Sequence, residues 1–133
     1  MLLFEKAKEL LHHPANEQAQ DEAIIDLLYL VMLSDKAIKL SEQDFVTDYV
    51  SSLNLPSGHS WEFYINAALP KVRTALQSQE KTEALLLDIS DRLKDHNLRN
   101  LALEVVQELI QVDATIAVEE SALVEKIRQR FGL

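Results

Sequence analysis

The chain has 133 residues, of which 47% are hydrophobic and 26% charged, so it suits one globular domain with a buried core. Thirteen basic and 22 acidic residues give a formal net charge of −9, which argues against a nucleic-acid partner, since phosphate binding relies on clustered cations. With two glycines, three prolines and no cysteine, the composition argues against an all-β fold and excludes disulfides and thiolate metal sites.

The first half of the chain contains three predicted helices. Apolar residues at helical spacing predict a helix over residues 2–13, which ends before Pro14. A second helix, over 18–33, starts acidic and then turns apolar on every side, so we expect it to form the buried centre of a bundle. A third helix, over 41–53, starts with Ser41 as N-cap and ends before the turn signal of residues 54–58.

The second half is also helical. A fourth helix is expected over 61–69, and Pro70 either kinks it or opens a further helix at its first position. A turn over 95–97 separates the later helices, which we expect at 82–94, 98–112 and 119–130. The sequence therefore predicts an all-α fold, with residues 1–133 forming a single compact bundle of about seven helices.

Aromatic and basic clusters accompany these helices. Trp61, Phe63 and Tyr64 at the start of the fourth helix are expected to pack in the core, with a partner-binding patch as the alternative. The last helix ends with three cations, which favour the negative end of its dipole and form a secondary candidate for a basic interaction patch. They are Lys126, Arg128 and Arg130.

Two segments of the chain, 25–53 and 103–131, align without a gap at an offset of 78 residues. Each segment consists of an apolar helix, an aspartate, a short loop with a central isoleucine, a glutamate and an amphipathic helix. The identical pairs are Asp35 with Asp113, Ile38 with Ile116, Glu42 with Glu120 and Val46 with Val124. The alignment predicts an internal two-fold repeat.

The acidic positions of the repeat have two interpretations. Loop aspartates can stabilise tight turns, and a glutamate in the first turn of a helix interacts favourably with the helix dipole. Alternatively, the carboxylates bind a hard divalent cation, Ca²⁺ or Mg²⁺, which prefers oxygen ligands. The candidate metal ligands are Asp35, Glu42, Asp113, Glu119 and Glu120.

The two loops are unequal as cation sites. Neither is an EF-hand, because neither has oxygen ligands at its third and fifth positions or glycine at its sixth. Lys36 and Lys39 place two cations beside the first pair of carboxylates, whereas the second loop has no lysine. The second loop is therefore the better candidate.

The duplicated pattern of helix, aspartate, loop, isoleucine, glutamate and helix resembles the tellurite-resistance TerB-like domains. The resemblance implies a small helical bundle with an internal repeat and an acidic divalent-metal site at Asp35, Glu42, Asp113 and Glu120. It also implies a role in stress responses, as a sensing or scaffolding module beside membrane-associated partners. Family loops usually have glycine directly after the aspartate, where this chain has Lys36 and Ala114.

These observations favour a non-enzymatic binding or sensing module in a bacterial stress response, with an unidentified protein partner and a divalent cation as its only expected cofactor. The alternative is a purely structural interaction domain, a homodimer or scaffold, without a metal. No nucleophile elbow, P-loop or dinucleotide-binding motif is present in the sequence. The longest apolar run, residues 27–33, is too short to span a membrane, and no signal peptide is recognisable, so we expect a cytoplasmic protein.

Overall fold

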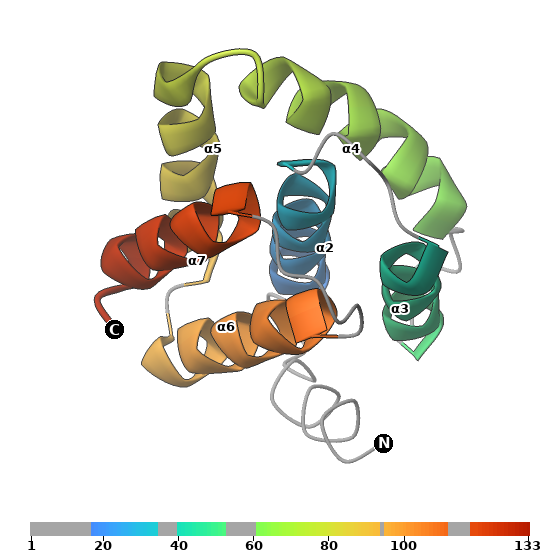
Figure 1. The fold of residues 1–133 in the computed structure, drawn as a ribbon. Coiled ribbons are helices and arrows are strands. Elements are labelled where there is room, and N and C mark those ends of the chain that lie inside the picture. The colour runs from blue at the N-terminus through green and yellow to red at the C-terminus, as the bar shows by residue number, and fades with distance from the viewer. Residues whose placement is uncertain (1–16, 35–39, 53–60, 94, 112–117) are drawn as a thin grey trace.

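The computed structural model describes residues 17–34, 40–52, 61–93, 95–111 and 118–133, and these residues form six α-helices without a strand (Figure 1). The helices are α2 (Glu17–Ser34), α3 (Leu40–Ser52), α4 (Trp61–Ala75), α5 (Gln79–Arg92), α6 (His96–Gln111) and α7 (Val118–Phe131). The predicted all-α class is confirmed for this part of the chain. The predicted helix over 2–13 lies outside the described residues.

Helix α2 is the centre of the bundle, as its apolar surface predicts. It packs against each of the other five helices, which surround it in Figure 1. Its apolar residues between Ala23 and Met32 are buried, except for the half-buried Tyr29. A helix that is apolar on every side can be stable in water only when other elements cover all of its faces, and here they do.

Helix α4 runs without interruption through Pro70, so the alternative in which Pro70 opens a separate helix is wrong. Figure 1 shows α4 arching over one end of α2. A proline inside a helix removes one backbone hydrogen bond and commonly bends the helix axis, which accounts for this shape.

The corner between α4 and α5 is built by two hydroxyl side chains. The hydroxyl of Ser78 caps α5 by accepting a hydrogen bond from the Lys81 N–H at 3.1 Å. The buried Thr82 hydroxyl donates to the Ala75 carbonyl at 2.8 Å, which joins the two helices. Helix α5 therefore begins at Gln79, three residues before the predicted start at Thr82.

The predicted turn over residues 95–97 is instead the start of α6, which begins at His96. The Asp95 carboxylate accepts a hydrogen bond from the Asn97 N–H at 2.8 Å, as an N-cap residue does. Arg99 donates from Nε to the Leu93 carbonyl at 2.6 Å and from Nη2 to the Ser90 carbonyl at 2.9 Å. These bonds fix α6 against the end of α5 by satisfying carbonyls in the last turn of that helix.

Within the described residues, no helix is long and apolar enough to cross a membrane.

Candidate functional site

The five predicted metal ligands are only partly within the described residues. Asp35 and Asp113 lie outside them. Glu119 and Glu120 belong to the first turn of α7, but their side chains are not among those described. Glu42 lies in the first turn of α3 with its side chain 1% exposed. Among described residues, no three acidic, histidine or cysteine side chains are close enough together to hold a metal ion.

Glu42 is one of several buried polar side chains on α3 and α2, two helices that pack against each other. Tyr49 lies two helical turns further along α3, and α2 contributes Gln20 and Asp21, each at most 8% exposed. Burial raises the pKa of the Tyr49 hydroxyl, and the negative charge of Asp21 raises it further. Groups buried in this way require polar or charged partners.

A buried ion-pair network at the centre of the bundle was not predicted from the sequence. Asp26, in the middle of α2, is completely buried. Its Oδ1 accepts a hydrogen bond from the Tyr64 hydroxyl at 2.7 Å. Its Oδ2 lies 2.7 Å from Lys71 Nζ and 2.6 Å from Arg92 Nη2, so that α4 and α5 are both tied to α2.

The network extends from Asp26 towards the surface. Arg92 also pairs with Asp88, one turn earlier on α5, at 2.8 Å. The Lys71 ammonium lies 5.9 Å from the centre of the Tyr64 ring, within the range of a cation–π contact. The side chain of Lys71 is 44% exposed and that of Arg92 21%, whereas that of Asp26 is inaccessible.

Two members of this network, Tyr64 and Arg92, have raised pKa values. Burial, the hydrogen bond to Asp26 and the charge of Asp26 all raise the pKa of the Tyr64 hydroxyl, and Arg92 opposes part of this effect. Burial lowers the pKa of Arg92, but the attraction of Asp26 and Asp88 outweighs it, and the pKa is raised. Tyr64 therefore remains neutral and Arg92 charged at physiological pH.

The geometry suits Asp26 to a structural role. Its two oxygens already accept three short hydrogen bonds, and it has no exposed surface from which to reach a ligand. Burying a charge without such partners costs several kcal/mol, which explains why the two cations and the phenol converge on it. One sequence signal could have revealed the network, because Asp26 is a lone charge within the apolar run of α2.

Tyr64 confirms one sequence prediction, since it is half-buried and packs against the core. The side chains of Trp61 and Phe63 lie outside the described set.

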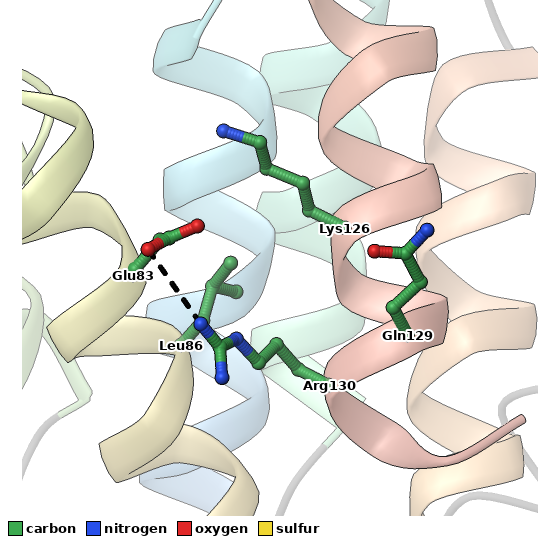
Figure 2. Close-up of a pocket in the computed structure, with 5 residues that line it drawn as sticks. All are labelled: Glu83, Leu86, Lys126, Gln129 and Arg130. Carbon is green, nitrogen blue, oxygen red and sulfur yellow. Dashed lines mark ion pairs between the residues drawn. The ribbon is translucent and has the colours of Figure 1, made fainter.

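A separate surface pocket lies between α5 and α7 (Figure 2). It has a volume of about 180 Å³ and is lined by Glu83 and Leu86 of α5 and by Lys126, Gln129 and Arg130 of α7. Arg130 Nη2 lies 3.6 Å from the Glu83 carboxylate across the pocket. Two of the predicted C-terminal cations, Lys126 and Arg130, thus share one concave surface.

Comparisons of the chain with protein-family models, with curated proteins and with solved structures give no match. The functional assignment consequently depends on the residue pattern and on the geometry of the bundle itself.

Proposed function

We propose that this chain is a non-enzymatic, TerB-like binding or sensing module of a bacterial stress response, with an acidic divalent-cation site in its duplicated loops. The observation that carries the proposal is the matched start of two helices. Helix α3 begins at Leu40 and α7 at Val118, and the aligned glutamates, Glu42 and Glu120, are each the third residue of their helix. Each loop would thus bring an aspartate and a first-turn glutamate to a helix N-terminus.

The burial of aligned apolar residues supports a duplicated helical unit. At each described pair of aligned apolar residues, both residues are buried and at most 9% exposed. These pairs include Leu28 with Val106, Val31 with Leu109, Phe45 with Leu123, Val46 with Val124 and Tyr49 with Ile127. Each aligned pair of helices also packs together, α2 with α3 and α6 with α7.

The second loop is the better cation site. A bound cation needs carboxylate oxygens that it can reach, and Glu42 in the first copy is 1% exposed. The first loop also contains Lys36 and Lys39, whose charges oppose cation binding, whereas the second loop contains none. We therefore assign the cation to Asp113, Glu119 and Glu120.

Thermal unfolding with and without millimolar Ca²⁺ or Mg²⁺ tests this assignment. A cation that binds only the folded chain stabilises it by about 2.7 kcal/mol at one hundred times its Kd, which raises the Tm. The increase should vanish in the double variant Asp113→Asn, Glu120→Gln. A matched control, Asp44→Asn with Asp48→Asn, removes two exposed carboxylates from α3 and should retain it.

A wild-type protein whose Tm does not respond to either ion would exclude the cation site and leave the acidic residues as helix caps. The second candidate function, a homodimer or scaffold without a metal, would then stand. It is favoured by two large apolar side chains, Leu40 and Leu87, which are 72% and 53% exposed. Sedimentation equilibrium of the wild type and of a Leu40→Ser, Leu87→Ser variant would show whether these residues hold copies together.

A further inference from the structure

The pocket between α5 and α7 is a basic concave surface on an acidic protein. Its lining contains two cations, Lys126 and Arg130, and one anion, Glu83, although the whole chain has a net charge of −9. Lys126 and Arg130 are four residues apart on α7, which places them on one face of that helix. Figure 2 shows both side chains extending from α7 on the side where Glu83 and Leu86 lie.

The ion pair across this pocket is loose. Arg130 Nη2 and the Glu83 carboxylate are 3.6 Å apart, longer than a charge-assisted hydrogen bond, and both side chains are more than 40% exposed. Exposed pairs of this kind contribute little to stability and are readily exchanged for other partners. No described acidic residue lies within ion-pair distance of Lys126. The pocket therefore has cationic groups that are available to a ligand.

We propose that this pocket binds the carboxylate of an acidic side chain from a partner protein. The carboxylate would replace Glu83 beside Arg130, whose planar guanidinium matches a carboxylate in shape, and would gain the charge of Lys126. This site is independent of the cation site proposed above, because it shares no residue with it.

The size of the pocket favours a side chain over a free small molecule. Its volume of about 180 Å³ lies below the roughly 300–1,000 Å³ that is typical of small-molecule sites. One glutamate or aspartate side chain fits such a space while the remainder of the partner stays outside. Glu83 disfavours ligands of higher charge, such as phosphate, because it stands on the opposite wall.

The test is a titration of the full chain, followed by amide chemical shifts, with a blocked tetrapeptide that contains one glutamate and one leucine. The same peptide with glutamine in place of glutamate is the ligand control. We expect the glutamate peptide to shift the amides of α5 and α7 around the pocket, and to bind at least threefold more tightly than the glutamine peptide. Equal binding of the two peptides would overturn the proposal.

Three variants, each with its Tm measured to verify folding, define the site. Lys126→Gln should weaken binding of the glutamate peptide by roughly threefold, since it removes one attractive charge. Arg128→Gln removes the same charge two residues away, from a side chain that does not line the pocket, and should leave binding unchanged. Glu83→Gln should strengthen binding by roughly threefold, because it releases Arg130 and removes the repelling carboxylate.

The increase for Glu83→Gln is the decisive result, because a merely structural ion pair would not produce it. Weaker binding in that variant would overturn the proposal. An equal loss in the Lys126 and Arg128 variants would also overturn it, by showing that only the general charge of α7 matters. Inorganic phosphate that binds more tightly than the glutamate peptide would likewise contradict a carboxylate site.

Discussion

The two aligned segments, 25–53 and 103–131, bury the described positions at which both have an apolar residue, but one aligned pair of acidic residues differs in exposure. Asp26 of α2 is completely buried in an ion-pair network. Its counterpart at an offset of 78, Glu104 of α6, is exposed. Similar helices can therefore place a carboxylate at the same position of the pattern and give it a different environment.

The difference arises from the helices that lie between the two segments. All three donors to Asp26 come from α4 and α5, which follow the first segment and precede the second. Both helices cover α2, whereas α6 packs mainly against α2, α3 and α7. An apolar pattern sets which face of a helix can be buried, but the neighbouring helices decide whether a charge on it is covered.

The first prediction concerns a position where the two segments agree. Tyr49 of α3 and Ile127 of α7 are aligned and both fully buried. Replacing a buried aromatic residue with alanine costs about 3–5 kcal/mol, and replacing isoleucine costs about 2–5 kcal/mol, through lost burial and the cavity that remains. Urea unfolding should show losses of this order for both Tyr49→Ala and Ile127→Ala. A loss below about 1 kcal/mol in either would mean that only one segment belongs to the core.

The second prediction concerns the position where they differ. Asp26→Ala should lower the free energy of unfolding by about 2–4 kcal/mol, because Arg92 and Lys71 lose their buried partner. This lies below the full cost of an unpaired buried charge, since Lys71 is 44% exposed and Arg92 keeps Asp88. Glu104→Ala is the matched control and should lower stability by less than about 1 kcal/mol, because its side chain is exposed. Equal losses in the two variants, measured by the same unfolding assay, would contradict the asymmetry.

Sequence periodicity predicts the helices and the central place of α2 because a 3.6-residue apolar pattern is local information. It does not predict the Asp26 network, whose donors are 38, 45 and 66 residues away along the chain. The lone aspartate in an apolar helix indicates that partners must exist, but not which residues they are. The pocket between α5 and α7 cannot be predicted from the sequence for the same reason, since Glu83 and Arg130 come together only after the chain folds.

Local signals also have limits at helix ends. Asp95 and His96 read as a turn because polar residues favour both turns and caps, and the structure uses Asp95 as a cap. Pro70 indicates a kink or a helix start, yet α4 continues through it, with Tyr64 before the proline and Lys71 after it both bound to Asp26.

The smallest predicted effect is a pH dependence of stability that comes from Tyr49 and has no counterpart at Ile127, since only the tyrosine side chain can ionise. Burial and the charge of Asp21 raise the pKa of Tyr49 above its ordinary value near 10, so the folded chain keeps a proton that the unfolded chain loses. The stability that this proton provides is complete below pH 10 and is lost as the pH rises above it. At pH 11 the loss is on the order of 1 kcal/mol.

Tyr49→Phe removes this group while keeping the ring in the core. Relative to its own stability at pH 8, the variant should lose less than the wild type on transfer to pH 11, by an amount on the order of 1 kcal/mol. Urea unfolding at the two pH values measures this difference. The contributions of all other titrating groups are the same in both proteins and cancel in the comparison. Ile127→Val is a suitable control, because it alters another buried side chain, on α7, but should leave the pH dependence of the wild type intact. An identical alkaline loss in wild type and Tyr49→Phe would show that the Tyr49 hydroxyl ionises in the folded chain as it does in water, and thus that this face of α3 is open to solvent.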